Sequence, residues 1–428
     1  MIATIRGTRR LTGEIKVPGD KSISHRALIL GSVASGASHV RGLSGGADVE
    51  STAACMRALG VEIEGSRVVG GGMAGLRRAA GALDCGNSGT TMRLLAGLLA
   101  AQPFKSRLVG DDSLSRRPMD RVVEPLREMG AAAAWDFDEV GAARAPQFRV
   151  GGRNRLTGVE FRSPVPSAQV KSAILLAGLY AEGKTAVVEP IKTRDHTEVM
   201  LAAMGADVKV AGLRVEVGRT ESLDPVDIDI PGDFSAAAFW LVAAGLVDGS
   251  RVRLLGVGVN PTRTAFAETL TSLGFAIKRS KPRLEAGEPV ADLEVGGSDL
   301  GRPLQLNGGA AAAMIDELPV LAVLATQLAG RSVIAGADEL RVKESDRLAA
   351  MADGLSAMGA DIELDDDGWL ITGPRRLEGA RVDSRGDHRI AMALAVAALI
   401  ADGKTEIEGA ECVNISYPDF FDHLEYLA

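Results

Sequence analysis

A polar, glycine-led turn that carries two cations leads into the first apolar segment of the sequence, at residues 18–30. Lys21 and Arg26 supply positive charge, and Ser22 or Ser24 can cap the free backbone N–H groups of a helix that begins there. The first-turn amides and the helix dipole also favour an anion at this end. These residue types therefore predict a cradle for a negatively charged group.

The same layout, a polar turn followed by an apolar helical segment, returns five more times. These later turns begin near residues 85, 163, 231, 315 and 385. A Leu-Gly or Met-Gly pair between them marks an expected helix end at 59–60, 129–130, 204–205, 273–274 and 358–359. Self-similarity at a fixed period of about 70 to 85 residues indicates repeated supersecondary units. We therefore expect six similar units.

Cations recur near the helix starts of most units, which favours a site for more than one anion. They are Lys21, Arg26, Arg117, Arg194, Lys343, Arg347 and Arg389. Each has an ordinary explanation as a solvated charge or a local ion pair, but their coincidence suits phosphate or carboxylate ligands. Lys343 and Arg347 are four residues apart, which predicts one helix face with Glu344 adjacent. Asp316 and Glu344 are then the acid and base candidates inside a cationic site.

The elements that position these residues can be read from hydrophobicity. Segments 27–34, 92–101 and 390–400 are apolar on nearly all sides, which predicts buried helices, whereas the helices ending in Leu-Gly or Met-Gly carry more charge and should lie outside. A chain of 428 residues exceeds the usual size of one core, so we expect two α/β domains with three units each. The predicted domains are residues 1–19 with 232–428, and residues 20–231. Hinges are expected near 18–21 and 230–235, with the site in the interdomain cleft.

Composition restricts the partners and the compartment. The formal net charge of −8 argues against nucleic acid or an anionic membrane as the main partner, because both need a basic face. Cys55, Cys85 and Cys412 lack metal-ligand or redox spacing, so free thiols are expected. The N-terminus lacks the apolar region of a secretion signal, and no apolar run reaches ~18 residues. The sequence therefore predicts a soluble cytoplasmic protein.

Seven motifs, in order along the chain, together resemble the 5-enolpyruvylshikimate-3-phosphate synthase family. They are 21–26 (Lys-Ser-Ile-Ser-His-Arg), 86–90 (Gly-Asn-Ser-Gly-Thr), 117–119 (Arg-Pro-Met), 167–169 (Ser-Ala-Gln), 341–347 (Arg-Val-Lys-Glu-Ser-Asp-Arg), 387–389 (Asp-His-Arg) and 416–419 (Ser-Tyr-Pro-Asp). The resemblance implies an inside-out α/β barrel in two domains, built from six βαβαββ-type units. It also implies transfer of the enolpyruvyl group of phosphoenolpyruvate to the 5-hydroxyl of shikimate 3-phosphate, through a tetrahedral intermediate, on the pathway to chorismate and aromatic amino acids. No metal or organic cofactor, a monomer, and glyphosate as phosphoenolpyruvate-site inhibitor are implied as well.

The same resemblance implies roles for individual residues. On the shikimate 3-phosphate side it places Lys21, Ser22, Arg26, Ser167, Ala168, Gln169, Arg194, Asp316 and Lys343. On the phosphoenolpyruvate side it places Lys21, Gly89, Arg117, Gln169, Arg347 and Arg389. Asp316 is implied as the base for the 5-hydroxyl, and Glu344, together with Lys21, as the proton donor to C3 of phosphoenolpyruvate. Ala168 offers only its backbone where other members have serine. Glu339 and Ile415 replace an asparagine and a lysine of some members, so neither is assigned a contact.

Two other functions compete with this interpretation. UDP-N-acetylglucosamine enolpyruvyl transferase shares the architecture and the phosphoenolpyruvate chemistry, but it carries a reactive cysteine in the loop before its Arg-Pro. Residues 111–117 contain no cysteine, which disfavours that enzyme. A non-catalytic repeat protein could bind acidic partners through its cationic turns, but it would not need the pair of Asp316 and Glu344.

Overall fold

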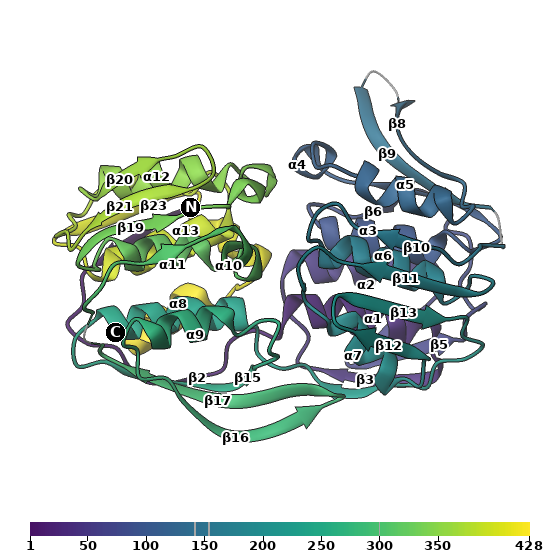
Figure 1. Cartoon of the computed structure of the whole chain (residues 1–428), viewed down its shortest axis with the longest axis horizontal. Coiled ribbons are helices and arrows are strands. Elements are labelled where there is room, and N and C mark those ends of the chain that lie inside the picture. Colours follow the sequence, from purple (N-terminus) through teal and green to yellow (C-terminus); the bar gives the residue numbers. More distant parts are fainter. Residues whose placement is uncertain (141–142, 153–154, 299) are drawn as a thin grey trace. The chain divides into compact units, whose positions relative to one another are not determined.

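The structure is a computed structural model and describes residues 1–140, 143–152, 155–298 and 300–428. The chain divides into two compact units, which Figure 1 shows coloured along the sequence. The first unit comprises residues 1–18, 231–283 and 289–428, and the second comprises residues 19–230 together with 284–288. The short excursion at 284–288 has no signal in the sequence.

The second unit contains three four-stranded sheets of one topology. Its strands are β3 (Ser35–Arg41), β4 (Glu62–Glu64), β5 (Arg67–Gly71), β6 (Leu83–Asp84), β7 (Lys105–Val109), β8 (Ala133–Val140), β9 (Ala143–Gly151), β10 (Glu160–Arg162), β11 (Lys184–Val188), β12 (Val208–Ala211), β13 (Arg214–Gly218) and β14 (Asp227–Asp229). The strand orders are β14–β3–β5–β4, β6–β7–β9–β8 and β10–β11–β13–β12. In each sheet the first pair is parallel and the other pairs are antiparallel. This repetition confirms the repeated units predicted from the sequence.

The first unit follows the same scheme. Its strands are β1 (Ile2–Arg6), β2 (Thr12–Ile15), β15 (Arg251–Gly258), β16 (Lys278–Glu285), β17 (Glu288–Gly296), β18 (Gln305–Leu306), β19 (Gly330–Ile334), β20 (Asp361–Leu364), β21 (Trp369–Gly373), β22 (Arg381–Asp383) and β23 (Lys404–Glu408). Their orders are β2–β15–β17–β16, β18–β19–β21–β20 and β22–β23–β1. In the last sheet β1 pairs antiparallel with β23, so the beginning of the chain completes the sixth of the repeats predicted from the sequence.

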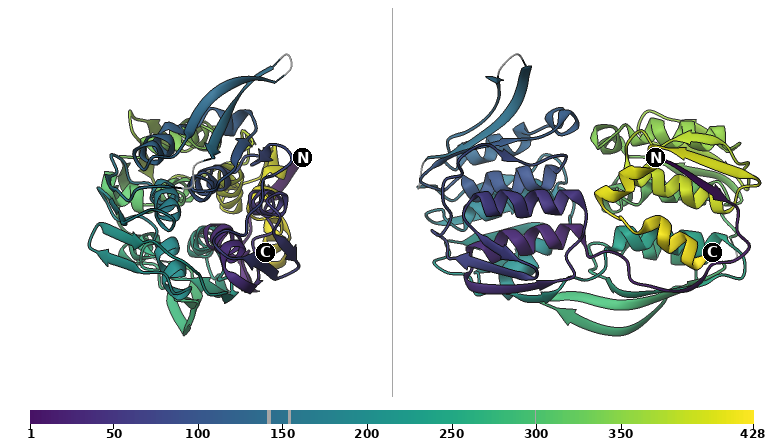
Figure 2. Two further views of the ribbon diagram at one scale, coloured as in Figure 1. Left: turned by 90° about the vertical axis from the view of Figure 1, so that its right-hand side faces the viewer. Right: turned by 180° about the vertical axis from the view of Figure 1, so that it is seen from behind.

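Each unit has buried helices inside its sheets (Figures 1 and 2). These helices are α1 (Lys21–Val33), α3 (Gly89–Leu99) and α6 (Ala168–Gly178) in the second unit, and α8 (Phe234–Leu246), α11 (Leu318–Ala325) and α13 (His388–Leu399) in the first. All three segments predicted to be buried helices lie in this set, and every residue of α13 is buried. A Cβ at Gly97 would lie 2.1 Å from the carbonyl oxygen of Ala173, so the close approach of α3 to α6 requires glycine there.

The remaining helices bury only part of their surface or are short. They are α2 (Ala47–Ala58), α4 (Asp112–Ser115), α5 (Asp120–Glu128), α7 (His196–Ala203), α9 (Ala265–Ser272), α10 (Gly308–Ala313), α12 (Arg347–Ala357) and α14 (Phe420–Leu427), with 3-10 helices η1 (Asp338–Val342) and η2 (Ala410–Ile415). Helix α2, for example, buries Val49 and Met56 while it exposes Glu50 and Arg57, as predicted for helices that end in Leu-Gly. In the part of the chain that the structure describes, no helix is long and apolar enough to cross a membrane.

Two local predictions from the sequence were wrong, both at helix starts. The cap of α1 is Asp20 rather than Ser22 or Ser24, because its carboxylate accepts a hydrogen bond from the Ile23 amide at 2.9 Å. The segment 343–347 is not a single helix face. Asp346 caps α12 by accepting from the Ala349 amide at 3.1 Å, so the helix begins at Arg347, whereas Lys343 is the C-cap of the preceding 3-10 helix η1.

Candidate active site

Arg26 lies in α1 with its guanidinium buried and held by three hydrogen bonds. Its Nε donates to Thr197 Oγ1 at 2.6 Å, Nη1 to the Ser22 carbonyl at 2.8 Å, and Nη2 to Ser172 Oγ at 2.7 Å. Burial lowers the pKa of Arg26 to about 10, and the nearby Glu198 carboxylate only partly offsets this. The side chain is therefore a cation at neutral pH whose burial is incompletely compensated, an environment that favours an added anion.

Four other predicted residues belong to the surroundings of Arg26. Lys21, the first residue of α1, forms an ion pair with the Asp48 carboxylate. Arg194 precedes α7 and lies close enough for its charge to lower the pKa of Arg26. The Ala168 carbonyl accepts from Ser172 Oγ at 2.6 Å, which joins the start of α6 to the Arg26 network. Ser167 caps α6 by accepting from the Val170 amide.

The start of α3 brings two further cations, Arg93 and Arg117, together in the same unit. Ser88 caps the helix, and a Cβ placed on Gly89 would lie 3.2 Å from Arg93 Nη1 and 3.4 Å from Arg117 Nη1. Arg117 Nη2 donates to Asn87 Oδ1 at 2.5 Å. The two guanidinium groups therefore lie beside a residue that has no side chain, and their charges suit a small anion.

Gln169 connects the start of α3 to α6. Its Oε1 accepts from Arg93 Nη1 at 2.5 Å, and its Nε2 donates to Thr90 Oγ1 at 2.8 Å. Sequence reasoning missed Arg93, because a single cation in an apolar helix gives no pattern. Its spacing of four residues from Gly89 was the available signal, since residues four apart share a helix face.

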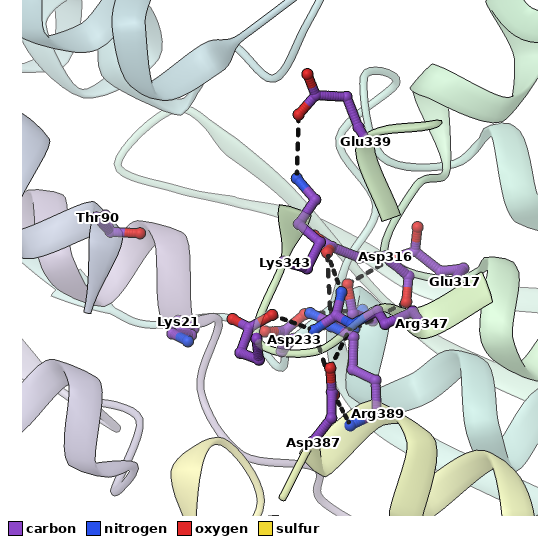
Figure 3. A network of polar contacts seen from close by, with 12 residues as sticks. Lys21, Thr90, Asp233, Asp316, Glu317, Glu339, Lys343, Arg347, Asp387 and Arg389 are labelled. Carbon is purple, nitrogen blue, oxygen red and sulfur yellow. Dashed lines mark hydrogen bonds and ion pairs between the residues drawn. The ribbon is translucent and has the colours of Figure 1, made fainter. Parts of the chain in front are cut away.

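Arg347 donates hydrogen bonds to three carboxylates of the first unit (Figure 3). Its Nε donates to Asp387 Oδ2 at 2.8 Å, its Nη2 to Glu344 Oε2 at 2.5 Å, and its Nη1 to Asp316 Oδ1 at 3.4 Å. Burial disfavours the charged guanidinium, but the Asp387, Glu344 and Asp316 carboxylates outweigh it and raise the pKa of Arg347. Arg347 is thus a permanent cation that holds both predicted proton-transfer carboxylates.

Asp316 also contacts a second arginine. Arg389 Nε lies 3.5 Å from Asp316 Oδ1, and Arg389 Nη1 donates to the Asp316 carbonyl at 3.1 Å. Lys343 Nζ lies 4.0 Å from Glu339 Oε2. Burial lowers the pKa of Lys343, while the Asp316 and Glu339 carboxylates act in the opposite direction. Asp316 therefore lies beside two guanidinium groups, those of Arg347 and Arg389.

A buried network beside Asp316 was also missed. Ser235 Oγ donates to the Glu317 carboxylate and accepts from Arg263 Nη2 at 2.6 Å. Arg263 Nη2 lies 3.6 Å from Glu317 Oε1, and both side chains are buried. The network fixes the start of α11 and hence the backbone next to Asp316. Its members are far apart in sequence, so no spacing could have revealed it.

The structure thus gathers the predicted residues in two groups, one in each unit. The second unit holds Lys21, Ser22, Arg26, Gly89, Arg117, Ser167, Ala168, Gln169 and Arg194, and the first holds Asp316, Lys343, Glu344, Arg347 and Arg389. Within the described ranges, no group of three or more His, Cys, Asp or Glu could hold a metal ion. The arrangement can bind anionic groups through cations and move protons through carboxylates.

His25, next to Arg26, gives the site a pH-dependent contribution to stability. It is fully buried, and its Nδ1 lies 2.7 Å from Thr52 Oγ1. Burial, and then the charges of Lys21 and Arg26, lower the pKa of His25 well below its ordinary value. The stability that neutral His25 provides is present above its unfolded pKa of about 6.5 and is lost as the pH falls, because only the unfolded chain then gains a proton readily.

We therefore expect His25→Gln to flatten the dependence of the unfolding free energy on pH between about pH 7 and pH 5. Denaturant titrations at several pH values measure that slope. The matched control is His39→Gln in β3, since His39 is exposed. An unchanged slope in His25→Gln would show that His25 does not resist protonation in the folded state.

Comparisons of the sequence and of the structure with known proteins both point to one family. The family model described as EPSP synthase (3-phosphoshikimate 1-carboxyvinyltransferase) matches residues 5–424. A 3-phosphoshikimate 1-carboxyvinyltransferase of Gloeobacter violaceus is 52% identical over 427 residues, which cover 98% of each chain. One of Desulforudis audaxviator is 50% identical over 432 residues, covering 100% of this chain and 99% of the relative.

The fold comparison is equally complete. The structure of EPSP synthase from Acinetobacter baumannii superposes with a TM-score of 0.87 at 42% sequence identity, and the match covers 100% of this chain and 98% of that one. The matches extend over both units and every residue of the two groups described above. The chain therefore belongs to the EPSP synthase family, the 3-phosphoshikimate 1-carboxyvinyltransferases.

Proposed function

We propose that the site residues of both units together bind the two substrates of this family's reaction and transfer its protons. The enzyme transfers the enolpyruvyl group of phosphoenolpyruvate to shikimate 3-phosphate, a step of aromatic amino acid biosynthesis. The observation that carries the proposal is the pair of carboxylates, Asp316 and Glu344, that contact one buried arginine, Arg347. Two carboxylates in one cationic cluster can take the two sides of a proton-transfer reaction.

Shikimate 3-phosphate is proposed to bind at the network around Arg26. The three bonds of Arg26 within the protein leave further N–H groups that can donate to the 3-phosphate. Ser22, Ser167, Gln169 and Arg194, with the Ala168 backbone, complete the phosphate side, while Asp316 and Lys343 contact the ring hydroxyls. A phosphate dianion there offsets the burial of the Arg26 charge.

Phosphoenolpyruvate is proposed to bind through arginines from both groups, namely Arg117, Arg347 and Arg389. Gly89 has no side chain between Arg93 and Arg117, and Gln169 orients Arg93 by accepting a hydrogen bond from it. Lys21 contacts both substrates. One turnover therefore uses residues of both units. The location of the site in the interdomain cleft, and the hinges near 18–21 and 230–235, stay predictions.

The proposed chemistry proceeds by addition and elimination. Asp316 accepts the proton of the 5-hydroxyl as that oxygen attacks C2 of phosphoenolpyruvate, and Glu344, with Lys21, delivers a proton to C3. The resulting tetrahedral intermediate returns a proton from C3 to the Glu344 carboxylate as the bond from C2 to the phosphate oxygen breaks, which restores the double bond. The proton held by Asp316 then passes to the released phosphate or to solvent. The arginines neutralise the departing phosphate.

The assignment of substrates is tested by two variants with opposite expected effects. Arg26→Lys should raise KM for shikimate 3-phosphate about tenfold or more while KM for phosphoenolpyruvate changes little, since a lysine cannot replace the planar fork and a lost charged hydrogen bond costs about 1.5–3 kcal/mol. Gly89→Ala should raise KM for phosphoenolpyruvate while KM for shikimate 3-phosphate changes little, because the added Cβ occupies space beside the Arg93 and Arg117 guanidinium groups. Steady-state kinetics with each substrate varied in turn measures both constants.

Gly309→Ala provides the control for the glycine substitution, because a Cβ at this helical glycine meets nothing within 4 Å. Both KM values should stay at the wild-type level in that variant. If Arg26→Lys instead impaired only phosphoenolpyruvate, or Gly89→Ala only shikimate 3-phosphate, the two binding assignments would have to be exchanged.

We also propose that the enzyme acts as a monomer in the cytoplasm. One chain supplies every residue assigned above, so the proposed chemistry needs no second copy. The substrates are metabolites of amino acid biosynthesis, which supports the cytoplasmic location.

A further inference from the structure

The hairpin of β16 and β17 ends in a turn that belongs to the second unit, although both strands join a sheet of the first unit (Figure 1). Ala286 and Gly287 form the turn with φ values of 46° and 86°, the left-handed conformation of tight two-residue hairpin turns. Ala286 packs against the core of the second unit. A Cβ on Gly287 would lie 3.0 Å from Val199 Cγ1, so the turn rests directly on α7.

Glu288, the residue after this turn, is paired with the first residue of α7. Its Oε1 lies 2.7 Å from His196 Nδ1, and both side chains are 2% exposed. A buried carboxylate is unfavourable unless a partner compensates it. The hairpin tip and the start of α7 are therefore fixed to each other by a polar contact as well as by packing.

Three consecutive residues at the start of α7 have three different partners. His196 contacts Glu288, as described. Thr197 Oγ1 accepts from Arg26 Nε at 2.6 Å and lies 2.7 Å from Ser172 Oγ.

Glu198, the next residue, anchors the start of α7 on another side. Its Oε1 lies 2.7 Å from Lys171 Nζ, which is also 2.9 Å from Glu189 Oε2. All three of these side chains are buried. The threonine that holds Arg26 is therefore positioned by a buried ion pair on one side and by the hairpin on the other.

We propose that Glu288 is a positioning residue for shikimate 3-phosphate, acting through His196 and Thr197 on Arg26. A guanidinium is planar and directs its N–H groups rigidly, so the site of the Thr197 oxygen helps to set the direction of the remaining donors. Loss of the Glu288 carboxylate frees the start of α7 from the hairpin and moves that oxygen. The inference rests on the proposed assignment of Arg26 to the 3-phosphate. Glu288 itself does not touch the substrate.

The test compares Glu288→Gln with Glu294→Gln. Glu294 lies on the same strand, but it pairs with Arg251 at the surface, 2.9 Å away. Calorimetric titration of the full-length enzyme with shikimate 3-phosphate should give a dissociation constant about tenfold higher for Glu288→Gln and unchanged for Glu294→Gln. At saturating shikimate 3-phosphate, KM for phosphoenolpyruvate should match that of the wild type in both. Wild-type affinity in a folded Glu288→Gln enzyme overturns the inference, as does an equal loss for both substrates.

A double-mutant cycle separates a role through Arg26 from a general structural role. If Glu288 acts through Arg26, adding Glu288→Gln to Arg26→Lys should weaken binding little beyond Arg26→Lys alone. If the dissociation constant of the double variant rose by the product of the two single factors, the residues would act independently and the inference would be overturned. If Arg26→Lys bound shikimate 3-phosphate normally, the assignment of Arg26 would fail and the inference with it. If Arg26→Lys bound shikimate 3-phosphate more weakly, as expected, but Glu288→Gln bound it as tightly as the wild type, only the inference would be refuted.

Thr197 provides a second route if Glu288→Gln does not fold. Thr197→Val keeps the shape but removes the oxygen, so binding should weaken about tenfold. Thr197→Ser keeps the hydroxyl and should bind as the wild type does. Equal losses in the valine and serine variants would mean that packing rather than the hydrogen bond matters, which would overturn the inference.

Discussion

Asp316→Asn should lower kcat by a factor of about 10² to 10⁴ while the enzyme still binds shikimate 3-phosphate, because the amide keeps the shape but cannot accept the proton of the 5-hydroxyl. In the wild type the Asp316 carboxylate lies 3.4 Å from Arg347 Nη1 and 3.5 Å from Arg389 Nε. An asparagine oxygen can still accept from both groups, so the surrounding arginines should stay in place. Phosphate release under saturating substrates measures kcat, and calorimetric titration measures binding.

Asp338→Asn is the matched control for this prediction. Asp338 lies in the 3-10 helix η1 and is exposed. Its variant should keep the wild-type kcat. Near-normal turnover in Asp316→Asn would assign the base to another residue, and a pure loss of affinity would make Asp316 a binding residue only.

Arg347→Gln should lower the free energy of unfolding by about 3–5 kcal/mol, the cost of leaving buried charges without their partner. Arg347 is 1% exposed and Asp387 is fully buried, and the Asp316 and Glu344 carboxylates share the same guanidinium. Glutamine can bond to one carboxylate, but it cannot neutralise three. Urea titration that follows the fluorescence of Trp240 and Trp369 reports on this unit, because both are buried in its core.

The loss in Arg347→Gln should also depend on pH. Without the arginine, the crowded carboxylates repel one another and their pKa values rise above the unfolded ones. A raised pKa in the folded state opposes folding above the unfolded pKa and ceases to do so as the pH falls. The difference from the wild type should therefore be largest near pH 7 and smaller near pH 5.

Arg385→Gln provides the control, because Arg385 forms an exposed ion pair with Asp353, and such pairs contribute little. Its unfolding transition should coincide with that of the wild type. If Arg347→Gln were as stable as this control, the carboxylates would have to be neutralised by groups other than Arg347.

The helices that carry the site residues could be predicted from the sequence, but most of the hydrogen bonds that position those residues could not. Beyond their polar first turns, helices α1, α3 and α13 are apolar on nearly all sides, so burial determines their place, and the polar residues at their N-termini must then gather in each unit. The face shared by Lys343 and Arg347 was predicted wrongly, because Asp346 caps α12 and the helix begins only at Arg347, which leaves Lys343 outside it. Spacing along a chain cannot show where such a cap divides it.

Contacts between distant residues could not be predicted. His196 and Glu288 are 92 positions apart, and nothing in a charged strand ending such as Leu-Glu-Ala-Gly-Glu indicates that its last carboxylate is buried. Tyr417 shows the converse. It belongs to a motif that supports the family resemblance, yet its hydroxyl accepts from Trp240 Nε1 at 3.0 Å in the core. That part of the motif reflects packing rather than contact with a substrate.

The division of the chain also sets an order for folding during synthesis. Residues 19–230 form the body of the second unit without interruption, so the ribosome completes that core first. The first unit must wait, because Ile2 of β1 pairs with Glu408 of β23, near the other end of the sequence. Glu288 is made after the body of the second unit is complete. We therefore expect the newly made second unit to hold Arg26 without the contact between His196 and Glu288, and to bind phosphate about tenfold more weakly until the hairpin has been made.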